Sequence, residues 1–351
     1  MRVLEVEPYY PRSEPPLGLM KLATWHKLRG AEVRFIRGTD PFNALLGDYE
    51  PDQIDITTPI FSWRTQEGVE TIKFYLERFP RAYIRVGGVK AWDTPEVYEI
   101  DRVELIRGNL PEVDECSPDY SLFPNLGRSV IYTMRGCPVG CGFCRVWRES
   151  GKLPTIIQNW KSHIRYDWKR LIIQDDNIIA APIEHLKAVC SVVSANDFSV
   201  DFNSGFEVHQ FNEEHAEVLS GLKIKPIRTA FDELKEEAEF LNTMRLIRKH
   251  ITQDWRSIIV YVLFNYLETP EECLYRALKV VEAGGSPYVM PFTPNNWIKG
   301  DMHRGQPFVS EKYGWTLEKI KRFYRFWNRY WIWISILKKN GKITSKDIWG
   351  N

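Results

Sequence analysis

The sequence of 351 residues has few cysteines, no excess of either charge and no long apolar run. Six cysteines are too few to cross-link a chain of this length by disulfide bonds, which excludes a disulfide-rich secreted scaffold. Lys and Arg number 47 and Asp and Glu 46, a formal net charge of +1, so no global field draws the whole chain to nucleic acid or to a membrane. No stretch offers about 18 uncharged apolar residues, and the first residues lack the apolar run of a secretory signal. We therefore expect a cytoplasmic protein without a membrane span.

In residues 1–125, short apolar runs such as RVLEVE and AYIRVGG alternate with amphipathic ones. This alternation is typical of strands and helices in turn, and it predicts a parallel sheet covered by helices. Pro124, Asn125 and Gly127 then interrupt the pattern and indicate a loop. We therefore predict an N-terminal Rossmann-like domain over residues 1–125.

The alternation resumes after this loop and gives six further strand and helix units. The expected strands contain SVIYTM, RLIIQ, VDFNSG, PIRTAF, SIIVYVLF and YVMPF. Parallel units in such a run favour a full or partial barrel. The predicted fold class is therefore α/β, with a partial (β/α)6 TIM-like barrel over residues 126–300 and a helical C-terminal extension over residues 301–351.

Three of the cysteines lie together in the string RGCPVGCGFC, as Cys137, Cys141 and Cys144. Three thiolates hold three irons of a cubane cluster and leave its fourth iron open, whereas a structural zinc site needs four ligands. The nearest histidine is His163, and no second cysteine pair follows. A zinc site that borrows a distant ligand, or thiols gathered by chance, stay as alternatives. The other cysteines, Cys116, Cys190 and Cys273, are scattered singly, which is typical of small buried hydrophobic residues.

The cysteine loop follows the first strand of a (β/α) series and has Phe143 just before its third cysteine. It resembles the signature of the radical S-adenosylmethionine superfamily. The resemblance implies a four-iron four-sulfur (4Fe-4S) cluster whose open iron is chelated by the amino and carboxylate groups of S-adenosylmethionine (SAM). It also implies that reductive cleavage of SAM gives a 5′-deoxyadenosyl radical that abstracts hydrogen from a substrate. The implied partner is a reductant such as flavodoxin or ferredoxin, and the substrate stays unidentified.

The same resemblance assigns further residues to the cofactor at the ends of the expected strands. They are Asp175, Asp176, Asn203, Ser204, Glu207, Arg228, Asp232, Phe264 and Asn265. Asp175 and Asp176 would receive the amino group of SAM, and Arg228 its carboxylate. Asp232 would bind the ribose, and Phe264 with Asn265 the adenine. Because parallel strands end at one mouth of a barrel, all of these residues should converge there. The alternative is that they only cap and turn the chain.

The N-terminal segments PPLGLMKLATWHKLRG and AYIRVGG are similar to the cobalamin-binding-like domain that precedes the barrel in many radical SAM enzymes. The sequence has no DxHxxG motif, so it offers no histidine as the usual lower ligand of cobalt. We therefore expect a domain that keeps the fold, with cobalamin less favoured than its absence. Gly87 and Gly88 would allow the close approach of a corrinoid. A cobalamin-dependent radical SAM methyltransferase or rearrangement enzyme is the alternative function.

Residues 315–339 combine helical spacing with many aromatic and basic side chains. An amphipathic helix that docks its aromatic face on the barrel is the favoured interpretation. The alternatives are a surface that stacks nucleobases, which would suit an RNA-modifying enzyme or a non-catalytic module that binds metal or nucleic acid, and a surface that lies on a membrane. Burial separates them, because both alternatives require Trp327, Trp331 and Trp333 to be exposed together.

Overall fold

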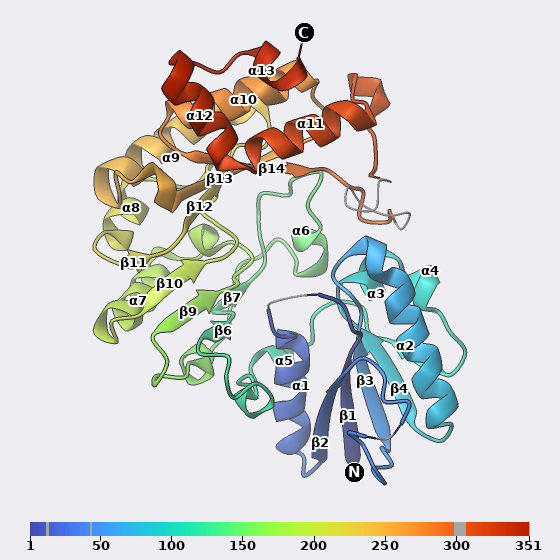
Figure 1. Cartoon of the computed structure of the whole chain (residues 1–351). Helices are drawn as coiled ribbons and strands as arrows, with labels where there is room; N and C mark the ends of the chain where they lie inside the picture. Colours follow the sequence, from blue (N-terminus) through green and yellow to red (C-terminus); the bar gives the residue numbers. More distant parts are fainter. Residues whose placement is uncertain (12–13, 43, 298–306, 351) are drawn as a thin grey trace.

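The computed structural model describes residues 1–11, 14–42, 44–297 and 307–350, and Figure 1 shows their arrangement. An α/β unit at the N-terminus lies beside a larger unit of strands and covering helices, and the C-terminal helices lie on the larger unit (Figure 1). The predicted boundary between barrel and extension, at residues 300 and 301, falls outside the described residues.

Five parallel strands form the N-terminal sheet. They are β1 (Arg2–Glu7), β2 (Glu32–Arg37), β3 (Gln53–Thr57), β4 (Tyr83–Gly87) and β5 (Val103–Leu105). The helices of this unit are α1 (Leu17–Lys27), α2 (Thr65–Arg78), α3 (Val89–Asp93), α4 (Pro95–Tyr98) and α5 (Pro111–Asp114). The Rossmann-like prediction names no strand order, and the observed order β2-β1-β3-β4-β5 is that of the flavodoxin-like doubly wound sheet. In such a sheet the crevice for a ligand lies at the carboxyl ends of the strands.

The strands of the larger unit correspond to the six that the sequence predicts. They are β6 (Ser129–Ile131), β9 (Arg170–Ile173), β10 (Ser199–Phe202), β12 (Ile227–Ala230), β13 (Ile258–Phe264) and β14 (Ser286–Pro291). All neighbours among them pair in parallel, as β6-β9-β10 and as β12-β13-β14. In the described part of the chain, one parallel bridge, from Phe206 to Thr229, joins the two sheets. The six predicted strands are therefore present as a row of parallel strands in two sheets, and a short β11 (Lys223–Ile224) that was not predicted lies beside β10.

Helices cover the outside of this row. They are α7 (Ile183–Ala195), α8 (Glu213–Leu219), α9 (Glu237–His250) and α10 (Pro270–Glu282). The start of α10 shows how the sequence sets a boundary: the Thr269 hydroxyl accepts a hydrogen bond from the Glu272 amide, and Pro270 occupies the first turn, where its missing N–H costs nothing.

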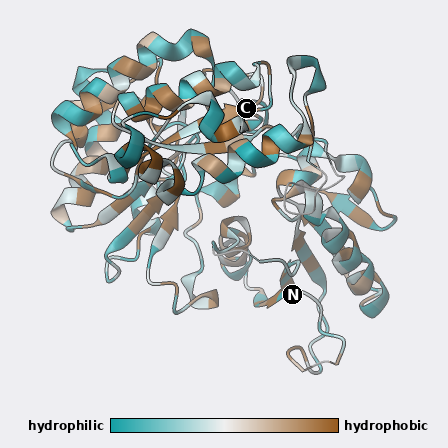
Figure 2. Cartoon of the chain, turned by 45° about the horizontal axis from the view of Figure 1, so that its top comes forward, coloured by the Kyte–Doolittle hydropathy of each residue, from teal (hydrophilic) through white to brown (hydrophobic). Residues whose placement is uncertain are grey.

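The C-terminal extension consists of α11 (Leu317–Trp327), α12 (Tyr330–Asn340) and α13 (Ser345–Trp349). Figure 2 shows hydrophobic and hydrophilic bands in turn along these helices, as expected of helices that cover a core. Trp327 and Trp333 are buried and belong to the hydrophobic core of the barrel, whereas Trp331 is 57% exposed. The three tryptophans are not exposed together, so the docking interpretation is favoured. Among the described residues, no helix is both long and apolar enough to span a membrane.

The two neighbouring tryptophans provide a matched test of this docking. We expect Trp327→Ala to lower the free energy of unfolding by about 3–5 kcal/mol, because it empties a filled site in the barrel core. Trp331→Ala should change it by less than about 0.5 kcal/mol, because its ring lies largely in water. Urea unfolding followed by circular dichroism measures both values. Equal effects of the two variants would contradict the packing described here.

Candidate active site

The cysteine loop is closed at its base by a short antiparallel ladder. β7 (Met134–Arg135) pairs with β8 (Thr155–Ile156), so the chain leaves and rejoins the barrel at one place. Within the loop the Cys137 amide donates to the Gly151 carbonyl at 3.1 Å, and the Cys144 amide donates to the Cys141 carbonyl at 3.1 Å. The loop is therefore held by its own backbone hydrogen bonds.

Two glycines allow the loop to pack closely. Gly136 has a φ of +94°, and a Cβ at this position would lie 2.3 Å from the Leu153 carbonyl oxygen, so only glycine fits. A Cβ at Gly142 would lie 2.8 Å from the hydroxyl of Tyr266, whose ring also meets Phe143 edge-on at 5.8 Å between centroids. Tyr266 follows β13, so the loop rests on the end of that strand.

The three thiols of the loop are half-buried. Burial, together with the charges of the neighbouring Cys144 and Glu236, raises the pKa of Cys141 to about 12. Burial also raises the pKa of Cys144. Cysteine binds metal as a thiolate, so these thiols need a strong positive charge beside them in order to ionise. Their surroundings fit an iron–sulfur cluster, which supplies that charge, and they disfavour three free thiolates.

A fourth protein ligand for zinc does not come from His163. This side chain is fully buried, and its Nε2 lies 3.1 Å from the Glu115 carbonyl oxygen. Burial lowers the pKa of His163 to about 4, so the ring stays neutral. His209 is likewise engaged, since its Nδ1 contacts the carboxylate of Glu207. Three thiols with an open fourth position therefore describe the loop better than a closed zinc site does.

In the polar segment after β9, the side chain of Asp175 contacts the barrel, and those of Asp176 and Asn177 contact the cysteine loop. Asp175 is 2% exposed, and its carboxylate accepts hydrogen bonds from the amides of Thr133 and Met134. Burial raises the pKa of Asp175 to about 7. Asp176 accepts from the Gly136 amide at 2.8 Å, and Asn177 donates to the sulfur of Cys137 at 3.4 Å. The segment lies beside the cysteine loop, as predicted, but the carboxylate of Asp175 serves the backbone after β6.

The predicted residues after β10 lie in an exposed turn. Asn203 and Ser204 are exposed there, with their polar groups at the carboxyl end of the strand. Glu207 accepts hydrogen bonds from the amides of His209 and Gln210, at 2.9 and 3.1 Å. Glu207 therefore caps its own turn, which is the structural alternative that the sequence left open.

Arg228 lies on β12 and is already paired within the barrel. Its guanidinium binds both carboxylate oxygens of Asp201 at 2.9 and 2.8 Å and donates to the Tyr261 hydroxyl at 2.8 Å. These partners lie on β10 and β13, so Arg228 ties three strands together. Arg228 was predicted to bind the carboxylate of SAM. Its guanidinium has no free pair of N–H donors for that contact, because the carboxylate of Asp201 already accepts from both.

Asp232 lies close to the cysteines, with Glu236, which sequence reasoning missed. The charges of both carboxylates act on the thiol of Cys141. Asp232 accepts a hydrogen bond from the Leu263 amide at 2.9 Å, and burial raises its pKa to about 7. Glu236 accepts from the amides of Asp232 and Glu233, both at 3.1 Å. The segment that follows β12 thus faces the cysteine loop, as predicted.

Phe264 and Asn265 do not present their side chains to the mouth. Phe264 is fully buried and packs against Trp315 and Phe323, with centroids 5.2 and 5.0 Å away. Asn265 is fully buried with a φ of +63°, and its amide group bonds to the backbone of Phe308 and Ser310. These two residues fasten the segment before α11 to β13. The residue of this turn that reaches the loop is Tyr266.

Two cavities flank the cysteine loop. One of about 350 Å³ is lined by the loop itself and by side chains that the sequence did not single out, such as Trp92, Arg145 and Arg148. The other, of about 300 Å³, lies at the carboxyl ends of β3 and β4 and is lined by Gly87 and Gly88. It has the position that a doubly wound sheet gives to a ligand, and its size is that of a small pocket for an organic molecule.

No protein-family model matches the sequence, and no curated protein matches it. Among solved structures, the cobalamin-dependent S-adenosylmethionine radical enzyme OxsB with aqua-cobalamin bound matches over 83% of this chain and 49% of its own, at 14% identity and a TM-score of 0.48. The apo form of OxsB matches over the same shares at 12% identity and a TM-score of 0.44. HemN from Escherichia coli, coproporphyrinogen III oxidase, matches over 47% of this chain and 44% of its own, at 11% identity and a TM-score of 0.37.

All three are radical SAM enzymes. This is the superfamily that the cysteine loop resembles. The chain spans about half the length of these three structures. At these identities and TM-scores the likeness assigns no activity, so a function has to rest on the residues of the site.

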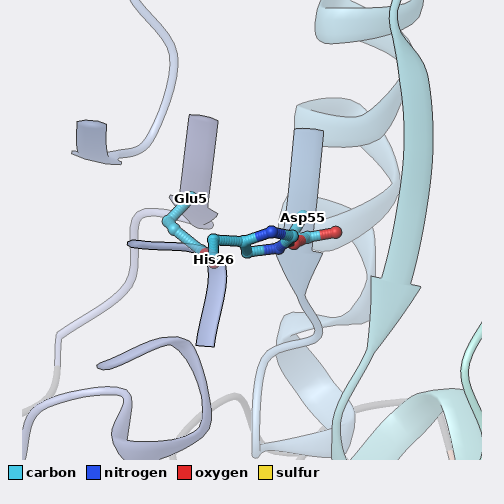
Figure 3. A group of neighbouring side chains, drawn as sticks. All are labelled: Glu5, His26 and Asp55. Carbon is cyan, nitrogen blue, oxygen red and sulfur yellow. Dashed lines mark hydrogen bonds and ion pairs between the residues drawn. The ribbon is translucent and has the colours of Figure 1, made fainter. Parts of the chain in front are cut away.

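A second group of ionisable side chains lies inside the N-terminal unit. Glu5, His26 and Asp55 lie together in Figure 3, and each brings one potential ligand atom within 4.8 Å of the others. Asp55, however, is bound by the Arg85 guanidinium at 2.7 and 2.9 Å and by His26 at 2.7 Å. A guanidinium that already neutralises this carboxylate opposes a metal ion there. Both carboxylate oxygens of Glu5 are buried without a hydrogen-bond partner, and burial raises its pKa well above the usual value.

This buried carboxyl group predicts a pH dependence of stability. With its pKa raised, folded Glu5 keeps a proton that the unfolded chain releases above about pH 4.3, so stability falls as pH rises, by up to about 1.4 kcal/mol per unit. Glu5→Gln, which keeps the shape without the proton, should flatten the fall between pH 5 and 8 in urea unfolding. Glu99→Gln, at a largely exposed carboxylate, should retain the slope of the unaltered protein. Parallel slopes for the protein and Glu5→Gln would contradict this account.

Proposed function

We propose that the protein is a radical SAM enzyme, which holds a 4Fe-4S cluster on Cys137, Cys141 and Cys144 and cleaves SAM reductively. The observation that supports this most is a loop with three half-buried thiols at the carboxyl ends of six parallel strands. When bound, the cluster and SAM supply the 5′-deoxyadenosyl radical. The remaining task of the chain is to hold these groups in place and to exclude competing reactions.

Each part of the loop contributes to this task. The β7–β8 ladder fixes where the loop begins and ends, and Gly136 lets the chain pass the Leu153 carbonyl. Asn177 donates a hydrogen bond to the sulfur of Cys137, an interaction that stabilises a thiolate. Hydrogen bonds to cysteine sulfurs also tune the potential of an iron–sulfur cluster.

For SAM, we propose contacts from four polar residues at the mouth, of which Asp176 is also paired with Arg135 at 3.3 Å. Asn203 and Ser204 are exposed at the end of β10, and Asp232 lies near Cys141. Asp176 faces the loop, where a carboxylate suits the ammonium of SAM. Asp175, Glu207, Arg228, Phe264 and Asn265 are committed to structural contacts, so we assign SAM to the other four residues.

The substrate of the proposed reaction stays unidentified, and the cavity of about 350 Å³ beside the loop is its proposed site. A small-molecule substrate is favoured over RNA because the aromatic residues of the extension are largely packed on the barrel. The proposed electron donor is a flavodoxin or a ferredoxin.

A cobalamin-dependent reaction is the second candidate. The cavity of about 300 Å³ at the end of the N-terminal sheet supports it, since it has the position that this sheet type gives to a ligand. Two features oppose it: no histidine stands in a DxHxxG motif, and the cavity is small for a corrinoid. We therefore propose that the domain works without cobalamin.

The cysteine assignment is tested by metal content and by cleavage of SAM. Protein purified and reconstituted without oxygen should hold about four irons per chain and should release 5′-deoxyadenosine from SAM when dithionite is present. Cys141→Ala should lose the cluster and this release, whereas Cys190→Ala, at a buried thiol outside the loop, should keep both. One tightly bound zinc per chain in place of iron would contradict the proposal.

The cobalamin question has a separate test. Because the usual lower ligand is missing, we expect weak binding or none when the protein is incubated with hydroxocobalamin and separated on a desalting column. The absorbance of the corrin then measures what the protein retains. A stoichiometric complex that survives the column would overturn this expectation and favour the second candidate.

A further inference from the structure

Among the contacts of the N-terminal unit with the cysteine loop is one made by the carboxylate of Asp93. Asp93 ends α3, and its Oδ2 accepts from the Lys90 ammonium at 3.0 Å. Both side chains are nearly inaccessible, at 4% for Lys90 and 3% for Asp93. Lys90 also donates to the carbonyl oxygen of Asn295 at 2.8 Å, so the pair touches the segment after β14. Charges are seldom buried unless they are paired, so this ion pair has a specific role in the contact.

The same oxygen of Asp93 binds a second cation, which belongs to the loop. Arg145 directly follows Cys144, and its Nη1 lies 3.1 Å from Asp93 Oδ2. The Nε of Arg145 lies 3.5 Å from Glu149 Oε2. The guanidinium is thus held between a carboxylate of the N-terminal unit and a carboxylate of its own loop, and its side chain is only 29% exposed.

A cation at this position acts on whatever the neighbouring thiolate binds. Reduction adds one negative charge to an iron–sulfur cluster, and a nearby positive charge stabilises the reduced form, which raises the reduction potential. The effect depends on where the guanidinium lies. An arginine released into water is screened and contributes less than one held in a partly buried position.

We propose that Asp93 is a positioning residue that holds the Arg145 guanidinium beside the cluster, so that the N-terminal unit helps to set the cluster's reduction potential. This inference rests on the proposed function, since it requires the cluster on the three cysteines. The N-terminal unit then has a role at the active site that does not depend on cobalamin.

The test is a double-mutant cycle in the cluster potential, followed by the electron paramagnetic resonance of the reduced cluster during a redox titration. Arg145→Gln should lower the midpoint potential of the otherwise unaltered protein, because it removes the cation. In an Asp93→Ala background the same change should have a much smaller effect, because Arg145 is already displaced. Asp93→Glu, which keeps the charge, should restore most of the effect of Arg145→Gln.

Two controls keep the outcome decisive. Asp93→Ala leaves Lys90 buried without its carboxylate, so the cycle is repeated with Lys90→Met added to remove both charges from the interior. Asp119→Ala removes a carboxylate of the N-terminal part that pairs with Lys27 and not with the loop, and it should leave the potential unchanged. Iron and sulfide are measured in every variant before titration.

The outcomes separate the inference from the proposed function. If Arg145→Gln shifts the midpoint potential equally with and without Asp93, the positioning role is overturned. It is also overturned if Arg145→Gln leaves the midpoint potential unchanged. An unaltered protein that takes up no iron would overturn the proposed function and this inference with it. A shift of the midpoint potential by Arg145→Gln in the unaltered protein, together with the loss of that shift in the Asp93→Ala background, would support the inference.

Discussion

The closure of the cysteine loop at the β7–β8 ladder is the constraint on which the other features of the site depend. The ladder is only two residues long on each side, so it needs support from elsewhere. Asp175 and Asp176 provide this support. Their carboxylates accept hydrogen bonds from the amides of Thr133, Met134 and Gly136, in the segment that leads into the loop. Without these acceptors the amides would be buried and unpaired, which costs about 1–3 kcal/mol for each group.

Much of the fold follows from local patterns in the sequence. The six strands of the barrel are predictable because each is a short apolar run between turns, and the thiols are predictable because their spacing lies within one loop. The strand order of the N-terminal unit was not predicted. Alternation of strands and helices indicates a parallel sheet. The Rossmann and flavodoxin-like sheets share this alternation and differ in the edge of the sheet at which successive strands are placed.

The partners of individual side chains could not be predicted in the same way. Asp175 and Asp176 are neighbours in the chain, yet one faces the backbone after β6 and the other the loop, because successive side chains point in different directions. Arg228 meets Asp201 and Tyr261 only through the register of three strands. Asp93 and Arg145 are 52 positions apart and belong to different parts of the fold. Such pairs depend on tertiary contacts that no local pattern contains.

The shared core of the barrel and the C-terminal extension has a consequence for dissecting the protein. Trp315, Phe323 and Trp327 are buried among the residues that line β13 and α10, so the extension supplies part of the interior of the barrel. The N-terminal unit, in contrast, has an apolar cluster of its own. A barrel cut free of residues 307–350 would expose a large apolar surface and aggregate, whereas a cut near residue 125 would leave the main cluster of the N-terminal unit whole and divide only the small cluster of Leu17, Val130 and Ile172.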